Sequence, residues 1–132
     1  MVSKRAKETT YFTAMSVLER AQKIEGAIRL EIGEPDFDPP AEVIDAAISS
    51  MLNGNSGYTS SKGKIQLRNS ISDYYQRTYD VVVDPERIIV TPGTSAALTM
   101  VTLAMLDNGD EAVLTDPYYA CYPNFIKQSG GE

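Results

Sequence analysis

Hydrophobic residues recur at helical spacing in three stretches of the chain, with polar or charged residues between them, and residues 96–106 are rich in the helix formers Ala, Leu and Met. Prolines or glycines stand next to most of these stretches, at places where they begin or end a helix. The pattern predicts helices over residues 11–24, 41–52, 64–79, 96–106 and 120–128. The third of these is expected to turn inward the residues Leu67, Ile71, Tyr74, Tyr75 and Thr78. Residues 1–7 are polar and basic and are predicted to be a loose tail.

Three shorter stretches have the pattern of extended chain. Residues 27–32 alternate apolar and charged side chains, and residues 88–90 and 111–115 are rich in β-branched or aliphatic residues, as buried strands are. From Ile88 onward the predicted order is strand, helix, strand, helix, which indicates an α/β layer arrangement. Ligands of such sheets bind just past the carboxyl ends of the strands.

The turn that follows Val90 is the first candidate for a binding site. It reads Thr-Pro-Gly-Thr-Ser and lies between a predicted strand and a predicted helix. Because the first turn of a helix has unpaired backbone N–H groups, we hypothesise that Gly93, Thr94 and Ser95 hold a phosphate group. The alternative is that Gly93 only makes a tight turn and Thr94 or Ser95 only caps the helix. The turn has neither the P-loop lysine nor the G-x-G-x-x-G pattern, so these residues alone do not decide between the two.

Composition limits the classes of function. The chain has 132 residues, of which 42% are hydrophobic and 23% charged, as in an ordinary globular domain. Its net charge of −6 argues against nucleic acid and anionic membrane surfaces as partners. No apolar run is long enough to span a bilayer, and we expect no secretory signal. The single cysteine, Cys121, excludes an internal disulfide framework and fits a reducing, cytoplasmic location.

The chain contains no histidine. Nucleophile systems of the Ser-His-Asp or Cys-His kind and Cys/His zinc sites are therefore excluded, and no metal site is expected. Any chemistry must use carboxylates, lysine, tyrosine or a cofactor.

Several segments together resemble one family, the pyridoxal-phosphate-dependent aminotransferases of fold type I, close to aspartate aminotransferases of class I/II. The resemblance rests on their order and spacing, since each one alone is weak. The segments are Ile32–Phe37, Tyr58 with Gly63 and Leu67-Arg68, Thr91–Leu98, Leu106 with Gly109–Glu111, and Asp116–Tyr119 with Tyr122-Pro123.

The resemblance implies a binding site for pyridoxal 5'-phosphate. In it Gly93, Thr94 and Ser95 bind the cofactor phosphate, and Tyr119 stacks on the pyridine ring. Tyr58 reaches across a homodimer interface to the phosphate of the partner subunit, although from the residues alone a plain exposed loop tyrosine is favoured. Many aspartate aminotransferases have Trp at the position of Tyr119, which leaves the choice of substrate open.

The resemblance also assigns a substrate contact and a domain division. Gly33 meets the substrate α-carboxylate through its backbone, where a side chain would take the substrate's space. Residues 1–50 form an N-terminal arm and small-domain segment with this loop, and residues 51–132 form an incomplete large domain that binds the cofactor. Pro39 departs from the family, where Thr often precedes the next proline and caps the helix.

The resemblance covers only an N-terminal portion of the family's fold. The lysine that holds the cofactor as a Schiff base lies beyond Glu132 in relatives, so no catalytic residue is assigned here. Lys62 comes directly after a serine, as the family's lysine does, but residues 63–68 match the earlier Gly-x-x-x-Leu-Arg element. In the family's sheet the strands near residues 88–90 and 111–115 pair with later segments. We therefore predict an isolated chain that is unstable, aggregated or rearranged.

The predicted fold is thus α/β, the N-terminal part of the fold type I architecture, with an incomplete large-domain sheet and flanking helices. The implied function is amino transfer between an amino acid and a 2-oxo acid. One alternative is a non-catalytic fragment that binds a phosphate ligand or pairs with a full-length relative. Another is an unrelated small α/β domain, against which the number of matching segments argues.

Overall fold

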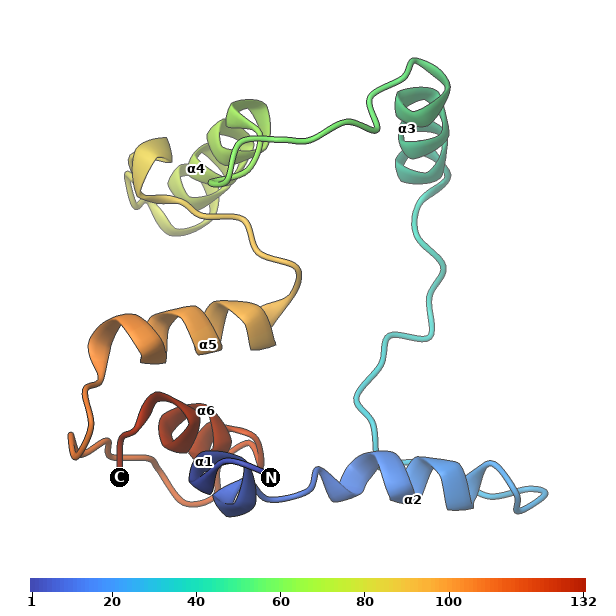
Figure 1. Cartoon of the computed structure of the whole chain (residues 1–132). Helices are drawn as coiled ribbons and strands as arrows, with labels where there is room; N and C mark the ends of the chain where they lie inside the picture. The colour runs from blue at the N-terminus through green and yellow to red at the C-terminus, as the bar shows by residue number, and fades with distance from the viewer. The chain divides into compact units, whose positions relative to one another are not determined.

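The computed structural model describes all residues, 1–132, as helices joined by extended segments (Figure 1). The elements are α1 (Lys4–Glu8), α2 (Thr13–Ala21), α3 (Ala41–Leu52), α4 (Ile65–Tyr79), the 3-10 turn η1 (Pro85–Arg87), α5 (Thr94–Met105) and α6 (Tyr122–Ser129). All five predicted helices are confirmed, and most of their ends move by one to three residues. The predicted loose tail is wrong, because Ser3 caps α1 by accepting a hydrogen bond from the Ala6 N–H, and α1 packs on α6.

The structure contains no β-strand, so the predicted sheet is not confirmed. Residues 88–90 and 111–115 are extended, but a strand needs a neighbour that bonds along its length. The Val90 N–H donates to the Lys62 carbonyl at 3.0 Å, which is a single bond. The Glu132 N–H donates to the Asp110 carbonyl and the Ala112 N–H donates to the Glu132 carbonyl, both at 2.8 Å. These last two bonds have the pattern of a parallel strand pair that is one residue long.

The chain forms two compact units. One consists of residues 1–35 and 92–132, and the other of residues 36–91. The first unit contains α1, α2, α5 and α6, and the second contains α3, α4 and η1. These limits describe how this chain packs against itself, and the predicted domain division at residue 50 stays a prediction.

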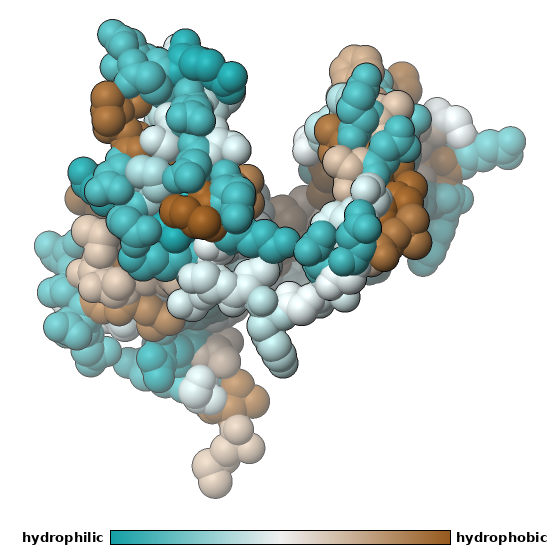
Figure 2. Space-filling view, turned by 90° about the horizontal axis from the view of Figure 1, so that it is seen from above, coloured by the Kyte–Doolittle hydropathy of each residue, from teal (hydrophilic) through white to brown (hydrophobic).

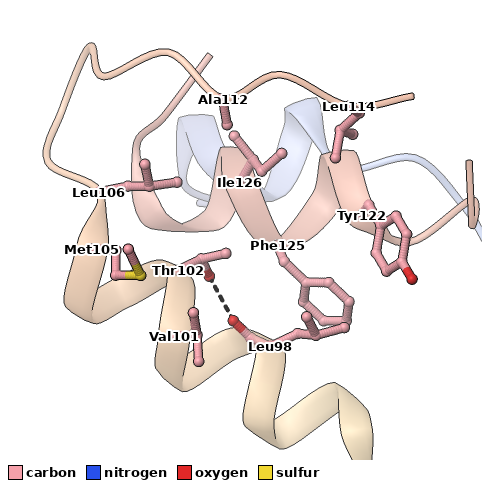
Figure 3. A pocket seen from close by; sticks show the side chains of 10 residues that line it. All are labelled: Leu98, Val101, Thr102, Met105, Leu106, Ala112, Leu114, Tyr122, Phe125 and Ile126. Atoms are coloured by element: carbon pink, nitrogen blue, oxygen red, sulfur yellow. Dashed lines mark hydrogen bonds between the residues drawn. The ribbon is translucent and has the colours of Figure 1, made fainter. Parts of the chain in front are cut away.

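In the first unit, α6 lies between α5 and α1. Its residues Phe125 and Ile126 are the only buried hydrophobic side chains of the chain. They face Leu98 and other apolar side chains of α5 across a cavity of about 340 Å³, which Ala112 and Leu114 also border (Figure 3). The Thr102 hydroxyl turns back to the Leu98 carbonyl of its own helix at 3.0 Å, so it presents little polarity to this cavity.

In the second unit, a buried arginine joins α4 to η1. Arg68 is 6% exposed and donates to the carbonyls of Gly63 and Pro85 and to the carboxylate of Glu86. Lys62 donates to the other Glu86 oxygen at 2.9 Å. The hydrogen bonds from Lys62 and then Arg68, followed by their positive charges, lower the pKa of Glu86. Burial of Arg68 was not expected, since the pattern placed Leu67 and Tyr74 inside, and both are 47% exposed.

Most apolar side chains of this chain are open to solvent. The accessible surface is 11201 Å², whereas a compact monomer of 14.5 kDa exposes about 6,900 Å². Figure 2 shows hydrophobic side chains at the surface among polar ones. On α3 they form one uncovered side, made of Val43, Ile44, Ile48 and Met51. None of the helices has the length and apolar composition that a membrane span requires.

The exposed surface predicts how the isolated chain behaves. Because so little apolar area is buried, we expect a broad thermal transition without cooperativity, accompanied by self-association. Differential scanning calorimetry with size-exclusion chromatography measures both properties. A sharp, cooperative melt from a soluble monomer would contradict this expectation.

Gly63 predicts a local effect in the second unit. Its φ is +94°, and a Cβ there would lie 2.7 Å from the Val90 Cβ. Gly63→Ala is therefore expected to push Val90 away and break the bond from the Val90 N–H to the Lys62 carbonyl. Hydrogen exchange of the Val90 amide should become faster in this variant. Gly54→Ala is the matched control, because Gly54 also has a positive φ of +74° and a Cβ there meets nothing within 4 Å, and equal exchange in both variants would refute the steric argument.

Candidate functional site

The candidate phosphate turn lies at the N-terminus of α5. Gly93 is the residue before the helix, with φ 86° and ψ 169°, a backbone conformation that essentially only glycine adopts. Because the residue before the helix is a glycine, it has no side chain that could cap this end of α5. The first N–H groups of a helix have no intrahelical partner, and here they lie at the positive end of a helix of 12 residues. The phosphate-binding role of this turn stays a prediction, beside the alternative in which Thr94 or Ser95 only caps the helix.

The two hydroxyl residues after Gly93 are accessible. Thr94 and Ser95 are both exposed, as is Gly93. One turn later the Thr99 hydroxyl donates to the Ser95 carbonyl at 2.8 Å. This bond uses the backbone of Ser95 and not its hydroxyl. Backbone donors and hydroxyls thus meet at one helix end, an arrangement that can bind an anion such as phosphate.

Tyr119 lies in a small cluster of aromatic rings. Its ring centroid is 5.7 Å from that of Phe12 at 64°, and 5.4 Å from that of Tyr122 at 73°, which are edge-to-face arrangements. Tyr119 is still 46% exposed. A hydrogen bond with Cys121, then burial, then the charges that Cys121 and Tyr122 can carry raise the pKa of Tyr119 above its ordinary value.

A buried asparagine fixes the segment that carries Phe12. Asn124 is 8% exposed and accepts the Thr10 N–H at 2.9 Å and the Thr10 hydroxyl at 3.1 Å through its Oδ1. Its Nδ2 donates to the Thr10 carbonyl at 2.9 Å. Sequence reasoning missed both Phe12 and Asn124 as residues near the candidate site. Asn124 beside the apolar Phe125 and Ile126 was the available signal, because an amide on a buried helix side must find partners.

The other two predicted site residues are Gly33 and Tyr58, and both are exposed. Gly33 is exposed in an extended segment of the first unit, and a Cβ there would meet nothing within 4 Å. No atom of this chain therefore requires glycine at this position. Tyr58 lies in the second unit, in the loop before α4, and is fully exposed at 110%. Their predicted roles stay predictions.

Comparison with known proteins identifies the family. The profile of the family described as aminotransferase class I and II matches residues 25–132. The chain belongs to this family. A match over this range includes the α5 turn, Tyr119 and Asn124.

Curated relatives show the extent of the match. The chain is 40% identical to the (5-formylfuran-3-yl)methyl phosphate transaminase of Methanocaldococcus jannaschii over 136 residues, which cover 100% of this chain and 37% of the relative. It is 36% identical to the aspartate aminotransferase of Bacillus subtilis, over 99% of this chain and 34% of that enzyme. The chain therefore spans about a third of the length of the relatives that it matches.

Solved aminotransferases have the same fold over this range. A tetra mutant of the Thermus thermophilus aspartate aminotransferase complexed with tryptophan superposes with a TM-score of 0.93 at 32% identity, over 100% of this chain and 36% of that chain. The alanine aminotransferase of Pyrococcus furiosus superposes with a TM-score of 0.89 at 32% identity, over 100% and 35%. This aminotransferase segment is thus an N-terminal portion of the fold type I architecture.

Aminotransferases of class I and II generally depend on pyridoxal phosphate. Two features are each chemically suited to such a group. The exposed first turn of α5 suits a phosphate, and the accessible ring of Tyr119 suits an aromatic face.

The hydrogen bond between Tyr119 and Cys121 generates a prediction about titration. Cys121→Ala removes the largest cause of the raised pKa, so the pKa of Tyr119 should fall toward about 10, the ordinary value for tyrosine. The phenol should then lose its proton at a lower pH than in the unaltered chain. Ultraviolet absorbance titration, with Tyr119→Phe to identify the signal, measures the shift. An unchanged or higher pKa would contradict the assigned cause.

Proposed function

We propose that this chain forms the phosphate-binding and ring-stacking part of the cofactor site of a pyridoxal-phosphate-dependent aminotransferase. The complete enzyme moves an amino group between an amino acid and a 2-oxo acid. When bound, pyridoxal phosphate draws electrons away from the amino acid's Cα and carries the amino group. The observation that carries the proposal is the exposed first turn of α5, where Gly93 precedes Thr94 and Ser95, in a chain of the aminotransferase family.

The proposed roles are phosphate binding by the first turn of α5, ring stacking by Tyr119 and a substrate contact by Gly33. Backbone N–H groups after Gly93, with the hydroxyls of Thr94 and Ser95, bind the phosphate, which gains about 0.3–1 kcal/mol from the helix dipole. Tyr119 stacks on the pyridine ring, a contact worth about 0.5–1.5 kcal/mol beyond burial. Gly33 offers its backbone to the substrate carboxylate.

The lysine that bonds covalently to the cofactor is expected from outside these residues. Lys62 is a poor candidate, because its ammonium group already pairs with Glu86 at 2.9 Å and is 3.4 Å from the Glu86 carbonyl. A lysine that acts as a nucleophile must have its amine free to attack, whereas this one is held in an ion pair.

Assembly and location belong to the same proposal. Tyr58 reaches the cofactor phosphate of a partner subunit in a homodimer. A side chain with this role is expected to be exposed in a single chain, as Tyr58 is. Cytoplasmic location fits the one cysteine, which is free. The second candidate function is a non-catalytic chain that pairs with a longer aminotransferase, and the uncovered apolar side chains of α3 and α5 favour it.

The test joins this chain to the part of a relative that it does not match. Residues 1–132 are fused to the Methanocaldococcus jannaschii transaminase, and separately to the Bacillus subtilis aspartate aminotransferase, each beginning beyond the matched segment. We expect at least one hybrid to be folded, dimeric and yellow with protein-bound pyridoxal phosphate, and to transaminate. Absence of bound cofactor from both hybrids would contradict the proposed function.

Gly93 supplies the sharpest variant in such a hybrid. Gly93→Ala strains a backbone conformation that L-residues avoid, at a cost of about 1–3 kcal/mol, and turns the first N–H groups of α5. We expect the affinity for inorganic phosphate, measured by displacement of pyridoxamine phosphate, to fall roughly tenfold or more. Gly109→Ala is the control, since Gly109 has a similar φ of +90° with no atom within 4 Å of an added Cβ. Equal losses in both variants would assign the effect to stability alone.

A further inference from the structure

The segment before α2 is attached to α6 by one amide side chain. Asn124 makes three hydrogen bonds to Thr10, and two of them go to the Thr10 backbone. A side-chain amide that both accepts from and donates to one residue fixes the position and the direction of that backbone. Because Asn124 is 8% exposed, water competes little for these bonds.

The same attachment determines where Phe12 lies. Phe12 follows Thr10 by two residues and precedes α2, whose first residue is Thr13. Its ring meets the ring of Tyr119 at 5.7 Å between centroids. Two rings more than a hundred positions apart in sequence are thus in contact. The hydrogen bonds between Asn124 and Thr10 connect the same two segments of the chain.

Tyr119 is held from the α6 side as well. The Tyr122 N–H donates to the Tyr119 carbonyl at 2.9 Å, and the Tyr122 ring lies 5.4 Å from the Tyr119 ring. The Tyr119 ring is therefore in contact with two other rings and yet 46% exposed. A side chain fixed in this way loses little rotamer freedom when a ligand stacks on it, which favours binding.

We propose that Phe12 and Asn124 are positioning residues for the cofactor ring: Asn124 fixes the Thr10 backbone, and Phe12 thereby orients the ring that stacks on the pyridine. This inference rests on the proposed function, because it assigns Tyr119 to the cofactor. It adds that Thr10 and Phe12 determine recognition of the aromatic part of the ligand and have no part in recognition of its phosphate.

The test compares two ligands in the hybrid enzyme. Pyridoxamine phosphate has the ring and the phosphate but no aldehyde that could bond to a lysine. Inorganic phosphate has no ring. Phe12→Leu keeps an apolar side chain of similar size and removes the ring. We expect it to weaken pyridoxamine phosphate binding roughly two- to tenfold and to change inorganic phosphate binding less than twofold. Asn124→Asp, which cannot donate to the Thr10 carbonyl, should shift the ratio in the same direction.

Two further variants distinguish positioning from loss of structure. Phe12→Tyr keeps an aromatic ring and should retain the unaltered ratio of the two affinities. Tyr11→Leu removes the neighbouring aromatic, which is 71% exposed, and should change neither affinity. Thermal melts of every variant accompany the titrations.

The outcomes are separable. If Phe12→Leu binds both ligands as the unaltered hybrid does, or weakens both equally, the positioning role is overturned while the proposed function stands. Failure of Phe12→Tyr to retain the ratio overturns it as well. If the unaltered hybrids bind no pyridoxamine phosphate, the proposed function itself fails, and the positioning role fails with it.

Discussion

The site-bearing unit depends on the packing of α6 between α5 and α1. Phe125 and Ile126 provide the only buried hydrophobic side chains, and both belong to this short helix. Asn124 of the same helix fixes the segment before α2 by its hydrogen bonds to Thr10. Tyr122, the first residue of the helix, donates its N–H to the Tyr119 carbonyl. If α6 were displaced, the aromatic cluster and the attachment of the N-terminal segment would be lost together. One helix of 8 residues therefore links two features of the candidate site.

Much of the apolar surface of this chain is not covered by the chain itself. The cavity between α5 and α6 is bordered almost wholly by apolar side chains, and residues 110–115 run beside it with backbone hydrogen bonds only at Asp110 and Ala112 (Figure 3). Unpaired extended backbone is unfavourable in an apolar setting. The chain superposes on complete aminotransferases over about a third of their length. The fold is shared over that third.

Local sequence signals predicted the helices well and the sheet poorly, for physical reasons. Residues 41–52 and 64–79 carry helical periodicity with proline, glycine or asparagine at their ends, which suffices because helix hydrogen bonds are local. Residues 111–115 have strand-forming side chains, yet a strand needs a partner that this chain does not supply. Gly93 was predictable as a turn that exposes helix donors. Asn124 and Phe12 were not, since their importance arises from contacts with Thr10 and Tyr119 far away in sequence.

The central claim is that backbone N–H groups at the start of α5 bind the phosphate of pyridoxal phosphate. Hydrogen–deuterium exchange of a hybrid enzyme, with and without the cofactor, tests it most directly, because it reports on the amides themselves. We predict strong protection of the amides of Thr94, Ser95 and Ala96 when the cofactor binds, with little change along the rest of α5. Bound cofactor with unchanged exchange at these three amides would contradict the claim.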